Sequence, residues 1–132
     1  QFPLLWTRRW FVDNILLIGD AQRTVHFSIG SGTRLAFEDA AALDRAFAEA
    51  GDDVPRALKV FERDRRPIVE KIVAAANASS YWYERIAEKM KLKPWQLAYD
   101  YMTRSGRMTD ERLRELSPKF MARVDIERSR RS

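Results

Sequence analysis

A short apolar run, an acidic residue, a glycine-rich turn and the start of a helix follow one another within residues 17–40. In chain order these segments read Leu17-Ile18-Gly19-Asp20-Ala21, Gly30-Ser31-Gly32-Thr33 and Glu38-Asp39-Ala40. A carboxylate at the end of a strand can accept hydrogen bonds from a sugar or polyol hydroxyl, and glycines let the backbone approach a flat ligand. The free N–H groups at the helix start favour negative charge. The stretch therefore predicts a strand, a turn and a helix that hold a nucleotide-like cofactor.

Two strands are predicted on the N-terminal side of this stretch. The first covers Leu4 to Phe11, a turn follows at Val12-Asp13-Asn14, and the second covers Ile15 to Ile18. A continuous apolar strand is typical of one that is covered on both faces. We therefore expect neighbouring strands that this chain does not contain.

The remaining two thirds of the chain are predicted to be helical. Apolar residues at helical spacing and the usual start and stop residues support this prediction. The predicted helices run from about Ser31 to Ala50 and from about Val54 to Met90, and from Pro94 to near Ser105-Gly106, with two more beginning at Thr109 and at Ser117-Pro118. Pro67 lies inside the long helix and is expected to kink or divide it.

Composition narrows the classes of function. The 132 residues include no cysteine and one histidine, His26, so neither a disulfide framework nor a cluster of histidine or thiolate metal ligands is expected. No apolar stretch is longer than five residues, which predicts a soluble chain without a membrane span, and a cytoplasmic location fits. The chain opens with Gln1-Phe2-Pro3 rather than methionine, which suggests a start within a longer protein.

The net charge of +5 lies in the C-terminal part. Residues 84–132 carry 13 basic and 8 acidic side chains, whereas residues 1–83 carry 11 of each. The basic run from Arg123 to Arg131 could bind nucleic acid, but Asp125 and Glu127 interrupt it, so a solvated helix face is the favoured interpretation. Packing is likewise favoured over base stacking for the aromatic residues between Tyr81 and Tyr101.

Three arginines near Pro67 have two interpretations. Arg63, Arg65 and Arg66 could bind phosphate groups because the guanidinium fork matches phosphate oxygens. Since Glu62 and Asp64 lie beside them, a salt-linked solvent face is favoured. Asp39 is expected to make a structural hydrogen bond rather than to form a catalytic pair with Glu38, because adjacent helix residues point in different directions.

The spacing of Gly19-Asp20-Ala21, Gly32 and Asp39-Ala40 resembles the second FAD motif of class A flavoprotein monooxygenases, the p-hydroxybenzoate hydroxylase family. The run from His26 to Thr33 is most similar to enzymes that hydroxylate salicylyl-CoA or anthraniloyl-CoA, and next to a violacein-type indole hydroxylase. The run from Phe61 to Pro67 and the segment from Thr103 to Arg107 are also similar to that group. The resemblance covers about residues 8–125.

This resemblance implies a fold and a function. The fold is an α/β fragment, mostly α, from the C-terminal part of an FAD-binding domain, with one or two strands followed by long helices. Residues 1–90 would belong to that domain and residues 91–132 would form a helical extension. The partners would be the remainder of the FAD-binding domain and a small aromatic substrate. In this family a nicotinamide reduces FAD, and one oxygen atom of dioxygen passes to an electron-rich ring.

The resemblance also implies roles for individual residues. Gly19 and Asp20 would contact the ribityl chain of FAD, and the N–H groups of the Gly30 to Arg34 turn would lie near flavin N1 and O2. That turn consists of Gly30, Ser31, Gly32, Thr33 and Arg34. The loop containing His26 and Phe27 would lie on the substrate side of the flavin, and a lone loop histidine is otherwise structural or solvated.

Two departures from the family pattern stand out. Relatives commonly read Gly-Asp-Ala-Ala-His, whereas this chain has Gln22 and Arg23 at the last two positions. The family's N-terminal Gly-x-Gly-x-x-Gly motif for the ADP half of FAD does not occur here, so the chain alone is not expected to bind FAD tightly. A noncatalytic helical interaction module is the alternative function, because it would explain the missing motif and the basic C-terminal third.

Overall fold

The computed structural model describes residues 3–130. The chain divides into two compact units, the first ending at Asn77 and the second beginning at Ala78. The division falls inside a helix, and each unit is described by itself. The boundary predicted at residues 90 and 91 concerns the family's domain rather than compactness, and it stays a prediction.

Unit 1 begins with a two-stranded antiparallel hairpin. Strand β1, Phe11–Val12, pairs with β2, Ile15–Leu16, so that Phe11 lies opposite Leu16. Asp13 takes a positive φ of 51° in the two-residue turn, a conformation that aspartate tolerates better than most residues. Leu16 packs against the core of the unit, whereas Ile15 is 68% exposed.

The first strand is much shorter than predicted. The segment before β1 pairs elsewhere: Thr7 N–H donates to the Gln22 carbonyl at 3.0 Å, Thr24 N–H donates to the Leu5 carbonyl at 3.1 Å, and Trp6 forms an isolated bridge with Arg23. These bonds draw residues 5–7 away from the hairpin and towards residues 22–24. The strand predicted from Leu4 to Phe11 is therefore wrong over most of its length, and the pairing fixes the loop that follows Asp20.

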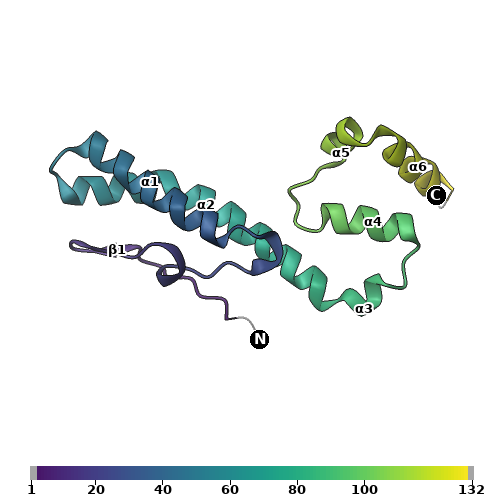
Figure 1. Cartoon of the computed structure of the whole chain (residues 1–132), viewed down its shortest axis with the longest axis horizontal. Coiled ribbons are helices and arrows are strands. Elements are labelled where there is room, and N and C mark those ends of the chain that lie inside the picture. The colour runs from purple at the N-terminus through teal and green to yellow at the C-terminus, as the bar shows by residue number, and fades with distance from the viewer. Residues whose placement is uncertain (1–2, 131–132) are drawn as a thin grey trace. The chain divides into compact units, whose positions relative to one another are not determined.

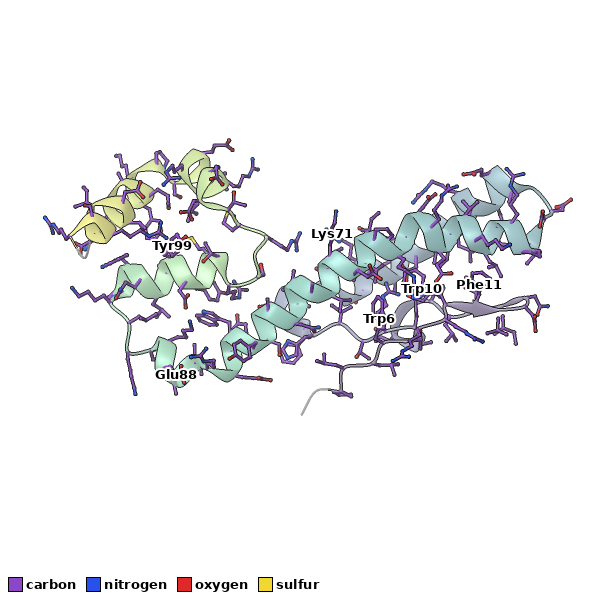
Figure 2. The ribbon with its side chains drawn as sticks, turned by 180° about the vertical axis from the view of Figure 1, so that it is seen from behind. Trp6, Trp10, Phe11, Lys71, Glu88 and Tyr99 are labelled. Atoms are coloured by element: carbon purple, nitrogen blue, oxygen red, sulfur yellow. The ribbon has the colours of Figure 1, made fainter. Side chains whose placement is uncertain are left out.

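Two long helices form the body of unit 1 and lie side by side in both views (Figures 1 and 2). Helix α1, Gly32–Ala50, ends at Gly51 as predicted, and helix α2, Val54–Glu84, contains 31 residues. Pro67 does not divide α2. Pro67 is exposed, so water can satisfy the backbone carbonyl that loses its helical partner. The end predicted at Met90 is also wrong, because α2 stops at Glu84.

The hydrophobic core of unit 1 joins the N-terminal segment to both helices. Trp10, 1% exposed, packs against Phe61 of α2 with ring centroids 5.9 Å apart, and Trp6 meets the edge of Trp10 at 6.2 Å. Figure 2 shows both tryptophans beside the helix pair. Leu35 of α1 and Val69 of α2 belong to the same cluster. This packing holds the turn after β2 against α1.

Unit 2 contains the C-terminal end of α2 and four shorter helices. They are α3, Ile86–Lys89; α4, Pro94–Thr103; α5, Asp110–Leu116; and α6, Pro118–Ser129. Proline begins α4 and α6, and the Thr109 hydroxyl caps α5, as the sequence predicts. A small core of Leu113, Met121 and Val124 packs against Trp95 and Tyr99.

The described residues are mostly helical and form one two-stranded sheet, which confirms the predicted fold class. The packing predicted for the aromatic residues is confirmed for Trp82, which is 6% exposed and meets the edges of the Tyr83 and Tyr101 rings at 5.2 and 5.5 Å, whereas Tyr81 is 60% exposed. Within residues 3–130 no helix combines the length and the apolar character that a membrane crossing requires.

Candidate functional site

The Gly19-Asp20 turn is a short 3-10 helix, Gly19–Ala21, packed against α1. Gly19 has a φ of 57°, and a Cβ atom added there would lie 3.5 Å from the Cβ atom of Ala36. The positive φ favours glycine, because this backbone region disfavours L side chains, whereas a Cβ atom at that distance would make an ordinary van der Waals contact with α1. Asp20 is exposed, and no described residue bonds its carboxylate. The carboxylate is therefore available to a ligand.

The glycine turn leads directly into α1. Gly30 takes a φ of 60°, and Ser31 precedes the first helical residue, Gly32. The Ser31 hydroxyl donates to the Ile29 carbonyl at 3.2 Å, and no side chain of the described part caps the helix N-terminus. Thr33 and Arg34 of the first turn are exposed. The N–H groups at this end, with the positive end of the helix dipole, are suited to an electron-rich ligand atom.

The loop before the glycine turn contains two stacked rings. The centroids of His26 and Phe27 are 4.4 Å apart with an interplanar angle of 25°. Nδ1 of His26 accepts a hydrogen bond from the Ser28 N–H at 3.2 Å, which caps the 3-10 turn Phe27–Ile29. Phe27 is 73% exposed, so this loop presents an aromatic surface beside the turn.

A buried ionic cluster lies behind the Gly19-Asp20 turn, and the sequence analysis did not predict it. Asp39, fully buried on α1, accepts a hydrogen bond from the Gly19 N–H at 3.0 Å. Its carboxylate also binds Arg23 Nη1 at 2.5 Å and Arg65 Nε at 2.8 Å. Both guanidinium groups are buried, Arg23 at 1% and Arg65 at 4% exposed. The predicted structural hydrogen bond of Asp39 is thus confirmed, with two arginines added.

The three neighbouring arginines of α2 have different surroundings. Arg63 is exposed and pairs with Asp64 at 2.6 Å, in agreement with the predicted salt-linked solvent face. Arg66 pairs with Glu62 and lies over the Trp10 ring at 4.8 Å. For Arg65 the solvent-face prediction is wrong: it points into the unit, to Asp39 and also to Glu38 at 2.9 Å. Asp39 was the sequence signal of this buried cation, because it is a carboxylate within the apolar stripe of a helix.

The surroundings of Asp39 lower the pKa of its carboxyl group. Burial by itself raises this pKa, but hydrogen bonds from Arg23, Arg65 and the Gly19 N–H outweigh burial and bring the pKa below its usual value. Asp39 therefore stays ionised when the protein is folded, and the cluster keeps its charges at neutral pH.

A lowered pKa makes stability depend on pH in a defined direction. Asp39 contributes its full stabilisation above the unfolded pKa of about 3.9, and this contribution is lost as pH falls through the lower folded pKa. The carboxyl groups of Asp100 and Asp110 also have lowered pKa values, so their contributions to the stability of the protein are lost in the same acidic range. We expect the stability difference between the wild-type protein and Asp39→Asn to be constant above about pH 5 and to shrink below about pH 4. Urea unfolding of both proteins between pH 2 and 7 measures this difference in the free energy of unfolding. A difference that grows as the pH falls would contradict the prediction.

Comparison with known families identifies the class of this chain. Residues 5–76 match the model of the FAD binding domain family, which is more than half of the chain and includes the Gly19-Asp20 turn, α1 and most of α2. The chain belongs to this family, the class A FAD-dependent aromatic monooxygenases, as the resemblance implied.

The more similar relatives are hydroxylases and monooxygenases. Salicyloyl-CoA 5-hydroxylase of a Streptomyces species is 43% identical over 107 residues, which cover 80% of this chain and 21% of that protein. A 3-hydroxy-4-methyl-anthranilyl-[aryl-carrier protein] 5-monooxygenase of Streptosporangium sibiricum is 41% identical over 83% of this chain and 30% of its own length. Protodeoxyviolaceinate monooxygenase of Chromobacterium violaceum is 37% identical over 68% of this chain and 24% of its own length. The chain thus spans between a fifth and a third of the length of these three relatives.

Proposed function

We propose that this chain contributes one wall of the flavin site in an FAD-dependent monooxygenase that hydroxylates an aromatic substrate. The observation that carries the proposal is the exposed Asp20 carboxylate, presented by a turn that is held against α1 in the part of the chain matched by the FAD binding domain family. A carboxylate that has no partner among residues 3–130 is a suitable acceptor for the hydroxyl groups of a polyol chain.

The residues present fit FAD. Gly19 lets the backbone turn so that Asp20 can accept hydrogen bonds from the ribityl hydroxyls. The turn from Gly30 to Arg34 offers backbone N–H groups at the start of α1, where the helix dipole favours the negative charge of a reduced flavin. Side chains built at Gly30 and Gly32 would project into open space, so the backbone there is accessible to a ligand.

We assign the substrate side to the loop of His26 and Phe27. The exposed Phe27 ring, stacked on His26, supplies an apolar surface that can orient an aromatic ring and exclude water from it. Bound FAD would supply the redox chemistry, with electrons from NAD(P)H and oxygen from O2. The two most similar relatives named above act on substrates linked to CoA or to a carrier protein, and an aromatic thioester of this kind is our proposed substrate class.

The remainder of the FAD-binding domain is the proposed partner of the hairpin. Val12, Ile15 and Ile18 are 53%, 68% and 36% exposed, an apolar surface that suits burial against further strands. We propose that residues 1–90 belong to the FAD-binding domain, that residues 91–132 form a helical extension, and that the enzyme is cytoplasmic.

Replacing Asp20 with alanine tests the proposal. Because a hydrogen bond to a charged group contributes about 1.5–3 kcal/mol, Asp20→Ala should weaken FAD binding by about ten- to a hundredfold in the intact protein. Asp20 is exposed and forms no hydrogen bond or ion pair with residues 3–130, so the melting temperature of the apoprotein should not change. The measurement is titration of apoprotein with FAD, followed by flavin fluorescence.

Asp44→Ala is the matched control. Asp44 is exposed on α1, so this variant removes the same charge at another surface position. Weaker binding in Asp20→Ala together with unchanged binding in Asp44→Ala supports the proposal. Wild-type affinity in Asp20→Ala would remove its main support.

A further inference from the structure

The buried cluster around Asp39 fixes both backbone groups of Gly19. Asp39 Oδ2 accepts from the Gly19 N–H at 3.0 Å, and Arg23 Nη1 donates to the Gly19 carbonyl at 3.3 Å. The backbone N–H groups of Gln22 and Arg23 also donate to that carbonyl, each at 3.1 Å. The peptide groups on both sides of the Gly19 Cα atom are therefore held by atoms of the described structure.

The cluster connects three segments that are distant in sequence. Asp39 comes from α1, Arg65 from α2, and Arg23 from the loop after the Gly19-Asp20 turn. Arg65 Nη2 also donates to the Leu35 carbonyl at 3.2 Å, and Arg23 Nη1 donates to Gln22 Oε1 at 2.8 Å. All three charged groups are buried, so water cannot replace a contact that is lost.

We propose that Asp39, with Arg23 and Arg65, is a positioning group that sets the direction of the Asp20 carboxylate towards the flavin. The inference rests on the proposed function, and it gives Arg23 a role in holding the turn that carries Asp20. Asp20 follows Gly19 directly, so a shift of the Gly19 peptide moves the Asp20 side chain. Asp39, Arg23 and Arg65 act through Asp20 and do not themselves touch the cofactor.

The hydrogen bonds of Arg23 are suited to orienting the Gly19-Asp20 turn. Its Nη1 atom makes the contacts to Asp39, Gly19 and Gln22, whereas Nε and Nη2 are buried with no partner in the described part of the chain. One donor position on a cation is therefore enough to hold the turn. Lysine offers that donor and the charge on a side chain of similar length, while methionine offers the length alone.

A double-mutant cycle for FAD affinity tests the proposal in the intact protein. We expect Asp39→Asn to weaken FAD binding by about two- to a hundredfold, the range of coupling between residues joined by one hydrogen-bond network, and to cause no further loss in an Asp20→Ala background. Arg23→Met should behave in the same way, and Arg23→Lys should restore affinity to within about threefold of wild type. The Arg23 pair keeps the test decisive if Asp39→Asn does not fold.

Val69→Ala is the matched control for stability. Val69 is fully buried in the apolar core of the same unit, a cluster that includes neither Gly19 nor Asp20, so its truncation destabilises the unit without disturbing the turn. Two results together would support a positioning role. Asp39→Asn and Arg23→Met should weaken FAD binding more than Val69→Ala does, and these losses should disappear in the Asp20→Ala background.

Two results would overturn the inference, and they are distinct from failure of the proposed function. The first is an additive cycle, in which Asp39→Asn weakens binding equally with and without Asp20. The second is affinity losses no larger than that of Val69→Ala. If Asp20→Ala itself keeps wild-type affinity, the proposed function fails first, and the positioning role fails with it.

Discussion

Replacing Asp39 with alanine is expected to lower the free energy of unfolding by about 3–5 kcal/mol, the usual cost of removing one partner from a buried ion pair. The variant leaves Arg23 and Arg65, which are 1% and 4% exposed, without their shared carboxylate. It also leaves the Gly19 N–H without its acceptor. The loss exceeds that of a surface ion pair because a buried cation cannot regain hydration.

Urea unfolding of the intact protein at pH 7 measures this effect, with far-UV circular dichroism as the signal. Asp64→Ala is the control, because Asp64 forms an ion pair of similar length with Arg63, but on an exposed face where such a pair contributes less than about 1 kcal/mol. Asp39→Asn should cost less than alanine because the amide oxygen still accepts one hydrogen bond. Equal stability losses for Asp39→Ala and Asp64→Ala would show that the buried cluster contributes nothing beyond a surface pair.

Several features of the fold were predictable because their causes are local. The start and end of α1 follow from the Gly30-Ser31-Gly32 turn and from Gly51, and Pro94 and Thr109 mark the starts of α4 and α5. Each of these signals depends on a few adjacent residues. They need no knowledge of what lies across the core.

Features that depend on distant partners were missed. Residues 5–7 pair with residues 22–24 rather than extending the hairpin, and no local pattern specifies that choice. Pro67 was expected to kink or divide α2, and its exposed position lets the helix continue undivided. In both cases the environment of the segment, rather than its composition, decides the outcome.

For the candidate site, too, the local features were predicted and the long-range contacts were not. The spacing of Gly19, Asp20 and Gly32 indicated a cofactor site because these residues lie within one short stretch. The Asp39 cluster was not predicted as a whole, since Arg23 and Arg65 lie 16 and 26 residues from Asp39 and meet it only after α1 and α2 pack. A carboxylate in the apolar stripe of α1, next to Leu35 and Ala42, was the one sequence signal of a buried cation.

Trp10 should be the most costly apolar side chain to truncate in unit 1, with Trp10→Ala lowering the free energy of unfolding by about 3–5 kcal/mol. It is 1% exposed, contacts the Trp6 and Phe61 rings, and carries the Arg66 guanidinium over its face at 4.8 Å. Truncation therefore removes buried area, two aromatic contacts and a cation–π contact together.

Trp10→Phe separates packing from the polar part of the indole. The Trp10 Nε1 group is buried and has no hydrogen-bond partner in the described structure, so its removal offsets part of the volume lost. We expect Trp10→Phe to cost less than half as much as Trp10→Ala in urea unfolding followed by circular dichroism. Phe37→Ala is the control, because Phe37 is 75% exposed on α1 and its truncation should change stability by less than about 0.5 kcal/mol. Similar losses for Trp10→Ala and Phe37→Ala would mean that the N-terminal segment does not pack on α2 in solution, and the Gly19-Asp20 turn would then lose the support that this packing gives it.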